Sequence, residues 1–564
     1  MSSRADDDRP PETDVEFDVV VIGGGFGGMY MLHRLRGVGM SARAYEVADD
    51  VGGTWYWNRY PGARCDVESM QYSYSFSEDL EQDWSWSEKY ASQPEIREFA
   101  RHVAVRFVLR WDIRFRTRVT TASFDEQTHR WTVETNRGDR VTGRFLVSAV
   151  GCLSAANLPA FEGMDDCQVP ILHTGQWPHR GFDFSGLRVG VIGTGSSAIQ
   201  SIPVIARDAE SVVVFQRTPN YAVPARNTPM NRDYERRVKA SYPDFRALAR
   251  TRMPAFLFQY DKRSALEVPP VARDRHYEDY WRRGGLGFLG AFSDLLLNQE
   301  SNDSAAEFVR GKIRSVVKDP VVARLLSPSN VFGCKRLCVD TGYYETFNLP
   351  HVNLVDVSET PIRCFTETGL VVADRRYDFD AIVCATGFAA MTGSLDRIRI
   401  TGRNGMTLKE KWKAGPRTYL GLTSAGFPNF FTVTGPGSPS VLANMMPAIE
   451  QHVDWITHCL LRMEEAGSRT IEPLAANEDD WVGHVNDVAS ESLRSSCSSW
   501  YIGANIPGRP RVFMPYIGGF PAYLERCNSE AESGYAGFAI EGGAPVAPPR
   551  AFPWTTRWSV VTSN

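Results

Sequence analysis

The sequence has 564 residues, of which 43% are hydrophobic and 23% are charged, with a net charge of −5. These values are ordinary for a soluble globular chain of roughly two to four domains, and they argue against a nucleic-acid-binding protein. No stretch has the roughly 18 unbroken apolar residues of a membrane span, and the acidic N-terminus lacks the apolar part of a secretory signal. We therefore expect a cytoplasmic protein.

The ten cysteines are scattered, and none of them form a C-x-x-C pair. Closely spaced cysteines are the usual sequence sign of a zinc site, and disulfide frameworks belong mainly to small secreted chains. The spacing therefore predicts reduced, mostly buried thiols, with neither a disulfide framework nor a metal site.

The first recognisable unit begins with a nearly continuous apolar strand at residues 17–22, which is typical of a parallel sheet. A glycine-rich turn containing Gly23, Gly25 and Gly28 follows, then a helix to about residue 38 and a strand that ends in Glu46. Such glycines let a pyrophosphate approach a helix N-terminus. A carboxylate in the position of Glu46 binds both ribose hydroxyls and repels a 2′-phosphate, so this unit suits FAD or NAD.

An aromatic loop, GGTWYWNRYPGARCD, occupies residues 52–66. Its simpler interpretation is a core loop. The alternative is a shaped pocket against a flavin, in which Gly53, Thr54 and Trp55 contact the cofactor and Asp66 is the one well-placed acid.

A linker at residues 161–178 contains His173 and Trp177. A single histidine in a linker is more often structural than catalytic. We therefore expect a hinge or supporting role for these two residues.

The first unit is repeated at residues 188–217. Its turn contains Gly193, Thr194, Gly195, Ser196, Ser197 and Ala198. Here the second strand ends in Arg217, followed by Thr218, and a cation at this position favours a 2′-phosphate. The second unit therefore suits NADP, with Lys335 as a second cation if the fold brings it close. One site of each kind predicts a flavoprotein that is reduced by NADPH.

Later segments complete the pattern. Charged helical periodicity over 227–330 predicts a helical insertion, and Ala305, Val309, Ile313 and Val317 form the apolar face of one helix. Strands are expected at 352–356 and 379–387, and a helix at 441–465. The strand at 379–387 fits either a core strand or one that returns near the flavin, as does the similar segment 145–151.

In combination, these motifs resemble those of the Baeyer–Villiger monooxygenases. The aromatic loop fits the motif [A/G]-G-x-W-x₄-[F/Y]-P-[G/M]-x₃-D at every defined position. The linker is similar to the fingerprint F-x-G-x₃-H-x₃-W-[P/D], but Cys167 and Val169 replace its Phe and Gly. The Lys335–Arg336 pair, residues 435–440 and the segment that begins at Trp500 also match. The resemblance covers about residues 17–540 and is closest to the branch that acts on aryl and steroid-type ketones.

The resemblance implies an α/β fold with two Rossmann-like dinucleotide-binding domains, for FAD and NADP, and a helical insertion. The FAD-binding domain is expected at 16–150 and 381–542, and the NADP-binding domain at 151–226 and 331–380. Residues 1–15 are expected to be disordered, and 543–564 to form an extended tail.

The resemblance also implies a reaction. NADPH reduces FAD, O₂ gives a C4a-peroxyflavin, and attack on a ketone yields an ester or lactone. Arg336 and Asp66 are then the catalytic candidates: the guanidinium stabilises the peroxide anion and the adduct, and Asp66 orients it. Lys335, Arg336, Asp66 and Trp500 are also expected to contact the cofactors. A buried ion pair that only joins domains remains the alternative for Arg336 and Asp66.

Three other functions compete with this one. A related flavin monooxygenase would oxygenate nitrogen or sulfur, and a non-catalytic module would bind NADPH as a redox ligand. A dithiol flavin reductase is disfavoured because Cys65 has no nearby cysteine in the sequence. The expected partners are a small-molecule ketone and O₂, without nucleic acid, and the chain is expected to be a monomer or a weak oligomer.

Overall fold

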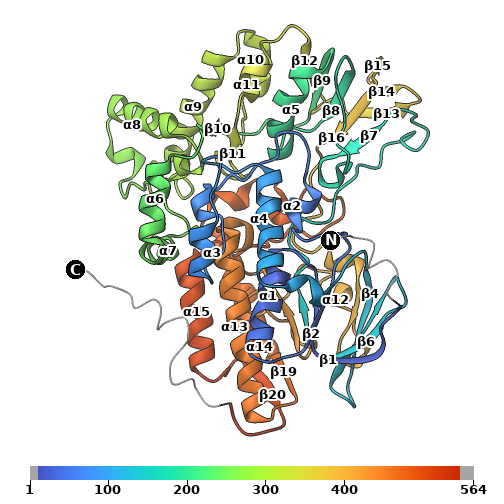
Figure 1. Ribbon diagram of the computed structural model, residues 1–564. Coiled ribbons are helices and arrows are strands. Elements are labelled where there is room, and N and C mark those ends of the chain that lie inside the picture. Colours follow the sequence, from blue (N-terminus) through green and yellow to red (C-terminus); the bar gives the residue numbers. More distant parts are fainter. Residues whose placement is uncertain (1–9, 547–564) are drawn as a thin grey trace.

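The computed structural model describes residues 10–546, which form two lobes stacked along the long axis of the molecule (Figure 1). The expected disorder of residues 1–9 and the expected tail over 547–564 concern residues outside this range. Residues 13–15 were also expected to be disordered, but they belong to the first strand. Its N-terminal part pairs with β6, and this pairing orders the segment despite its polar sequence.

The lower lobe is built on an eight-stranded mixed sheet of order β17-β4-β5-β6-β1-β2-β3, with β18 paired to β6. Its strands are β1 (Thr13–Ile22), β2 (Ala42–Tyr45), β3 (Ile113–Arg114), β4 (Val119–Asp125), β5 (Arg130–Thr135), β6 (Arg140–Ser148), β17 (Arg399–Thr401) and β18 (Phe430–Thr432). β1 is parallel to β2 and β6, and its last four residues are buried, as its apolar sequence predicts.

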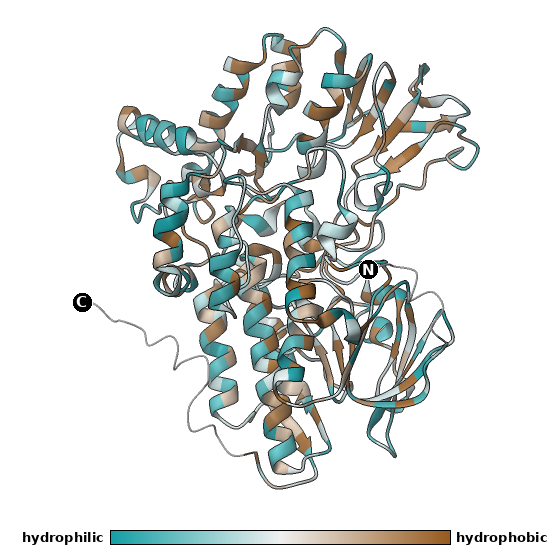
Figure 2. Cartoon of the chain, viewed as in Figure 1, coloured by the Kyte–Doolittle hydropathy of each residue, from teal (hydrophilic) through white to brown (hydrophobic). Residues whose placement is uncertain are grey.

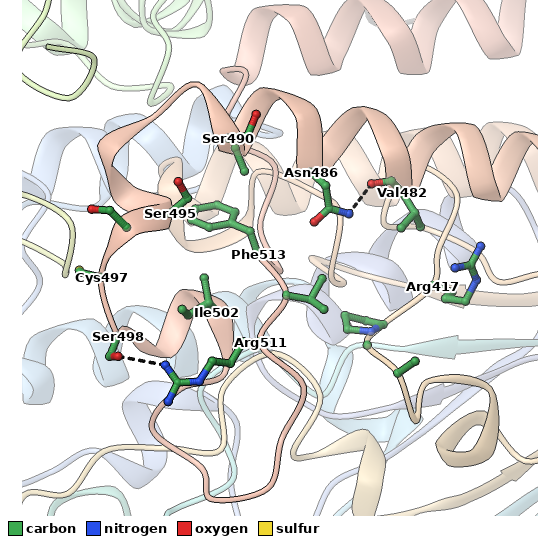
Figure 3. Close-up of a pocket in the computed structure, with 16 residues that line it drawn as sticks. Arg417, Val482, Asn486, Ser490, Ser495, Cys497, Ser498, Ile502, Arg511 and Phe513 are labelled. Atoms are coloured by element: carbon green, nitrogen blue, oxygen red, sulfur yellow. Dashed lines mark hydrogen bonds between the residues drawn. The ribbon is translucent and has the colours of Figure 1, made fainter.

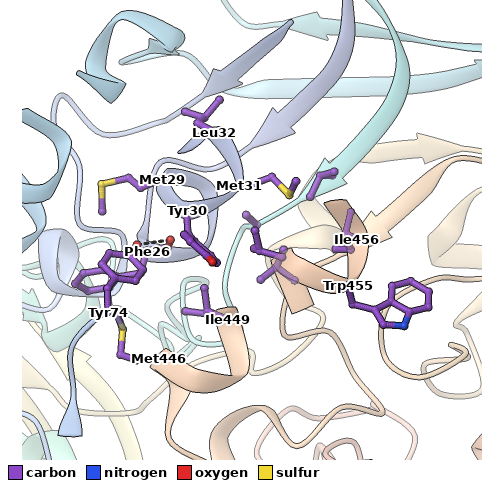
Figure 4. Packing of buried hydrophobic residues seen from close by; sticks show 14 of the residues in the cluster. Phe26, Met29, Tyr30, Met31, Leu32, Tyr74, Met446, Ile449, Trp455 and Ile456 are labelled. Atoms are coloured by element: carbon purple, nitrogen blue, oxygen red, sulfur yellow. Dashed lines mark hydrogen bonds between the residues drawn. The ribbon is translucent and has the colours of Figure 1, made fainter. Parts of the chain in front are cut away.

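Helices cover one face of this sheet. α1 (Phe26–Gly37) packs against α13 (Met445–Ala466), where the Tyr30 hydroxyl donates a 2.8 Å hydrogen bond to Asp454, and Met29, Tyr30, Ile449 and Trp455 belong to one buried apolar cluster (Figure 4). The hydroxyl of Tyr74 donates a hydrogen bond of 2.5 Å to the carbonyl of Phe26 at the start of α1. The first turn of α1 is thus held by the loop that carries Tyr74. Other elements of this lobe are α2 (Thr54–Trp57), α3 (Glu78–Asp83), α4 (Gln93–Arg106), α12 (Leu408–Lys411), α14 (Ala475–Ser490), α15 (Phe520–Glu532), β19 (Thr470–Pro473) and β20 (Phe538–Glu541).

The upper lobe is built on a five-stranded parallel sheet of order β12-β9-β8-β16-β7. Its strands are β7 (Ile171–His173), β8 (Arg188–Ile192), β9 (Ser211–Gln216), β12 (Val352–Asp356) and β16 (Ala381–Cys384), and α5 (Ser196–Asp208) follows β8. A smaller antiparallel sheet, β13 (Ile362–Thr366), β14 (Gly369–Val372) and β15 (Arg375–Asp378), lies beside it. The two turns that the sequence predicts therefore belong to two separate sheets.

The expected boundary at residue 380 is wrong. β16 was assigned to the second part of the first domain, but it lies between β8 and β7 in the upper sheet. An entirely apolar strand fits the centre of either parallel sheet, and the pairing of Ala381–Cys384 with Val189–Ile192 decides between them. The chain returns to the lower sheet only at β17.

The segment 227–330 contains the helices α6 (Arg232–Ala240), α7 (Tyr242–Arg250), α8 (Pro270–Arg283), α9 (Gln299–Val316) and α10 (Pro320–Leu326). The predicted apolar face of α9 is buried, since Ala305 and Val309 are 0% exposed and Ile313 is 1% exposed. α8, at the edge of the molecule, is mostly hydrophilic, whereas the strands of the upper sheet are mostly hydrophobic (Figure 2). β10 (Ala222–Pro224), β11 (Cys338–Asp340) and α11 (Tyr343–Thr346) flank this insertion.

Two of the ten cysteines do not follow the prediction of reduced thiols. Cys334 and Cys497 form a disulfide across 163 residues of sequence, and the other eight are free. Spacing rules detect only cysteines that are neighbours in the chain, so they miss a pair that folding brings together. Within residues 10–546, no helix is long and apolar enough to cross a membrane, and no cluster of side chains could hold a metal ion.

Gly28 offers a test of how α1 meets the first turn. A Cβ at this position would lie 1.9 Å from the backbone oxygen of Gly23, whereas one on Gly37, at the end of the same helix, would meet nothing within 4 Å. We expect Gly28→Ala to lower stability by about 1–3 kcal/mol, because backbone atoms must move. Gly37→Ala is the matched control. Thermal melting measures the stability of both variants. An equal loss in the two would contradict the close packing at Gly28.

His452 predicts a loss of stability in acid. Its Nδ1 accepts a 2.8 Å hydrogen bond from the Thr434 amide, Nε2 lies 2.9 Å from the Tyr523 hydroxyl, and burial lowers its pKa to about 3. As the pH falls below the usual histidine pKa of about 6.5, the unfolded chain binds a proton at this residue that the folded chain does not. Acid therefore favours unfolding. Burial acts in the same direction on His173 and His458, whose pKa values fall to about 4.

We expect the melting temperature to fall between pH values of about 7 and about 5, and His452→Gln to be less stable at neutral pH but less sensitive to acid. An unchanged pH dependence in this variant would show that His452 does not contribute to the acid sensitivity.

Candidate functional site

A cavity of about 1460 Å³ is lined by residues of both sheets and by loops from distant parts of the chain. It contains the two glycine-rich turns and nearly every residue that the sequence marks for a cofactor. The predicted residues that line it are Gly23, Gly25, Glu46, Gly53, Thr54, Trp55, Asp66, Gly193, Thr194, Gly195, Ser196, Ser197, Arg217, Thr218, Lys335, Arg336 and Trp500. Gly28 is the one residue predicted to bind a cofactor that does not line the cavity. Glycine is required there because a Cβ would collide with the backbone of the first turn.

The first turn is tightly packed on its neighbours. A Cβ on Gly23 would lie 2.6 Å from the oxygen of Ala149, and one on Gly53 would lie 3.0 Å from the Cα of Gly25. The aromatic loop therefore rests directly on the turn, and both positions require glycine. Trp55, in this loop, donates a 3.0 Å hydrogen bond through Nε1 to the hydroxyl of Tyr72.

Glu46 follows the end of β2 and is buried. One carboxylate oxygen accepts a 2.6 Å hydrogen bond from the Gly24 amide, and the other accepts a 2.8 Å bond from the Ala48 amide. Burial raises the pKa of Glu46, while these backbone amides oppose the rise. The backbone thus holds the carboxylate at the edge of the cavity, where the sequence predicts the ribose.

Both helices that follow the turns begin at a glycine without a side-chain cap: α1 after Gly25 and α5 after Gly195. Their first amides are therefore available to an anion, as pyrophosphate binding requires. At the second turn, the hydroxyl of Thr194 donates a 2.8 Å hydrogen bond to the carbonyl of Thr218, and the hydroxyl of Ser197 lies 3.2 Å from that of Thr174. The first bond fixes the turn against the end of β9, and the second holds it near the end of β7.

Arg217 and Lys335 are brought close enough to influence each other. Burial lowers the pKa of Lys335, and the positive charge of Arg217 lowers it further. Two like charges are costly to hold together unless an anion binds between them. This pair is the arrangement that the sequence predicts for a 2′-phosphate.

Arg336 and Asp66 form a two-pronged ion pair. Nε donates to one carboxylate oxygen at 2.7 Å and Nη2 to the other at 2.9 Å, while Nη1 donates to the carbonyl of Val441 at 2.6 Å. The two side chains are 28% and 17% exposed. Burial opposes the charge of Arg336, but Asp66 outweighs this effect and raises the pKa of the guanidinium. Arg336 is therefore a permanent cation on the wall of the cavity.

The charge of the lining is strongly unbalanced. Seven cationic side chains face two carboxylates, Glu46 and Asp66. The cations are Arg64, Arg118, Arg217, Lys335, Arg336, Arg397 and Arg511. Two dinucleotides carry several negative phosphate charges, so this surplus fits FAD and NADP together. The sequence gives no sign of four of these cations: Arg64 occupies an undefined position of the aromatic-loop motif, and Arg118, Arg397 and Arg511 lie outside any motif.

The predicted hinge residues lie beside the cavity, outside its lining. His173 ends β7; its Nδ1 accepts a 3.0 Å hydrogen bond from the Gly175 amide, and burial lowers its pKa to about 4. Trp177 is 4% exposed, and its ring centroid lies 6.1 Å from that of Phe184. Between them, Gly175 and Gln176 do line the cavity. A neutral, buried His173 suits a supporting role.

Comparison with known proteins agrees with this geometry. Residues 17–244 match the family model described as flavin-binding monooxygenase-like. A Baeyer–Villiger monooxygenase of Pseudooceanicola batsensis is 42% identical, over 92% of this chain and 95% of its own. A phenazine N-monooxygenase of Lysobacter antibioticus is 39% identical, over 93% and 97%. A solved structure of an oxidised steroid monooxygenase bound to NADP is 54% identical with a TM-score of 0.90, covering 94% of this chain and all of that one.

The fold, the two turns, the cationic cavity and these similarities agree with the family resemblance of the sequence motifs. The expected α/β architecture, with FAD and NADP as cofactors, is confirmed. The chain belongs to the Baeyer–Villiger monooxygenases, the FAD- and NADPH-dependent enzymes that use O₂ to oxidise ketones to esters or lactones.

Proposed function

We propose that Arg336 and Asp66 form the catalytic pair and that the first turn holds FAD and the second NADPH. The observation that carries this proposal is the two-pronged pair on the wall of the cavity that both turns share. FAD bound at the first turn would, once reduced by NADPH, supply the chemistry that activates O₂. Arg336 supplies a fixed positive charge that stabilises negative charge developing on the ketone oxygen, and Asp66 fixes the plane of the guanidinium.

The substrate is proposed to be a bulky, apolar ketone of aryl or steroid type. Val441 lines the cavity, and its carbonyl accepts from Arg336, which places an aliphatic side chain next to the guanidinium. Val67, Ala443, Met445 and Ile449 also line the cavity. The similarity to a steroid monooxygenase supports this class. A panel of steroid, aryl and small cyclic ketones with product analysis tests it, and turnover of the small ketones alone would contradict it.

Oxygenation of nitrogen is the second candidate, because a phenazine N-monooxygenase is among the relatives. The pair of Arg336 and Asp66 favours the ketone reaction, since attack on nitrogen develops no oxyanion for a guanidinium to stabilise. An aromatic N-heterocycle in the same panel separates the two reactions. Oxygenation of nitrogen gives an N-oxide with every ring bond intact, whereas the ketone reaction inserts oxygen into a carbon–carbon bond.

The proposal also covers the oligomeric state and the cellular compartment. One chain supplies the whole described lining of the cavity, so we propose a monomer or weak oligomer as the working unit. We propose the cytoplasm as the compartment because eight of the ten cysteines are free, and the Cys334–Cys497 disulfide is then a bond that must withstand a reducing environment.

Arg336→Ala tests the catalytic pair. We expect FAD to stay bound and reducible by NADPH, and ester formation to fall by roughly 100-fold or more, because the stabilising cation is lost. Arg336→Lys should also be poor, since an ammonium cannot make the planar two-pronged contact. Product yield per NADPH is the measurement.

Arg246→Ala is a matched control for this experiment, because Arg246 forms a buried ion pair with Glu81 at 3.0 Å and does not line the cavity. It should lose stability but retain ester formation. A near-normal ester rate in Arg336→Ala would remove Arg336 from the reaction.

Arg217→Ala tests the placement of NADPH. We expect the KM for NADPH to rise about tenfold or more, with little change for NADH, because only the 2′-phosphate loses a partner. Lys335→Ala should act in the same direction. Arg207→Ala, at an arginine that is 70% exposed near the end of α5, is the control. Equal losses for NADPH and NADH would contradict the assignment of Arg217.

A further inference from the structure

The Cys334–Cys497 disulfide joins two segments that reach the cavity. Cys334 directly precedes Lys335 and Arg336, and Cys497 lies three residues before Trp500; the two Cα atoms are 6.2 Å apart. The cross-link therefore connects the segment that carries the two cations to the segment that carries Trp500.

The segment 497–511 is a thin wall between two hollows. Cys497, Ser498 and Arg511 line the main cavity and also a groove of about 680 Å³ on the opposite side. Figure 3 shows this groove between α14, which carries Asn486 and Ser490, and the wall. The side chain of Arg511 spans the wall and donates a 3.1 Å hydrogen bond to the hydroxyl of Ser498.

The wall has little regular structure of its own beyond a single 3₁₀ turn at Trp500–Ile502. Side chains make much of its attachment to the rest of the protein. Asn505 donates to the carbonyl of Phe388 at 2.7 Å, and Arg509 donates to the carbonyl of Ala390 at 3.1 Å. Just before the wall, Nε of the half-buried Arg494 donates to the carbonyl of Gly333 at 3.1 Å. The disulfide adds a covalent attachment at the end nearest Arg336.

We propose that Cys334 and Cys497 are positioning residues, whose disulfide holds the Trp500 wall against the Lys335–Arg336 segment and keeps the cavity arranged for NADPH. A covalent link between segments 163 residues apart restricts the separation of two parts that weak contacts alone leave free to move. The inference rests on the proposed role of Lys335 in holding NADPH. It predicts that breaking the link weakens NADPH binding and allows reduced oxygen to leave as hydrogen peroxide, while FAD stays bound.

Cys497→Ser and Cys334→Ser test this directly in the holoenzyme. Each should retain FAD and the rate of flavin reduction at saturating NADPH, while KM for NADPH and the rate of peroxide release without ketone both rise, each roughly threefold or more. Cys364→Ser, at a free cysteine on β13, is the matched control and should change neither quantity. A purely structural cross-link would change melting temperature and FAD content in the serine variants without this split between KM and kcat.

The wild-type protein supplies a second measurement without substitution. A small dithiol donates two electrons and two protons, so that the protein disulfide becomes two thiols and the reductant becomes its own disulfide. Cys497 is half-buried and lines an open groove, which gives the reductant access. Dithiol treatment should raise KM and peroxide release in the wild type and leave Cys497→Ser unchanged.

Thiol counting in denaturant decides whether the link exists. The untreated wild type should show eight thiols out of ten cysteines. Ten thiols, or serine variants with unchanged KM and peroxide release, would overturn the proposal. These readouts need no ketone, so a failure to find ester products would contradict the proposed function without touching this inference, and the reverse also holds.

Discussion

The contact between Arg336 and Asp66 organises the centre of this protein. The two residues are 270 positions apart, and the third nitrogen of the Arg336 guanidinium donates to Val441 in a third segment. A partly buried pair of this kind is costly to form and more costly to break, because loss of one partner leaves the other charge without compensation. The fold must therefore bring three distant segments to one point. That point lies on the side of the cavity that both glycine-rich turns line. A charge held so firmly needs little reorganisation when negative charge develops beside it.

The aromatic loop supplies the structural support for this arrangement. It rests on the first turn through the close approach of Gly53 and Gly25, and it also contacts α5 of the upper lobe. The Tyr60 hydroxyl donates to the Gln200 side chain at 2.8 Å, and a Cβ on Gly62 would lie 2.2 Å from the Gln200 carbonyl. One loop thus contacts the first turn and the helix that follows the second turn, and it carries Asp66 at its end. Its dense pattern of glycine, proline and aromatic residues is the sequence consequence of fitting a chain into this narrow space.

Much of this was predictable, because local chemistry determines it. The strands before each turn, the charges of Glu46 and Arg217, and the apolar face of α9 are all encoded within short windows. Features that depend on distant pairing were not predictable. β16 reads as a buried strand whichever sheet it joins, and neither Cys334 nor Cys497 has a close cysteine neighbour in the sequence. The additional arginines of the cavity also carry no pattern, because folding gathers them one at a time from separate segments.

The linker at 161–178 departs from the family fingerprint at two positions, and the fold accommodates both residues. Where the family fingerprint has Phe and Gly, Cys167 and Val169 are half-buried and pack against the apolar cluster that Phe365 and Leu370 form in the small antiparallel sheet. Val169 therefore adds packing where a glycine would add backbone freedom. Two residues later the chain enters β7, and His173 is fixed by the Gly175 amide. The linker is thus anchored to the upper lobe along its length.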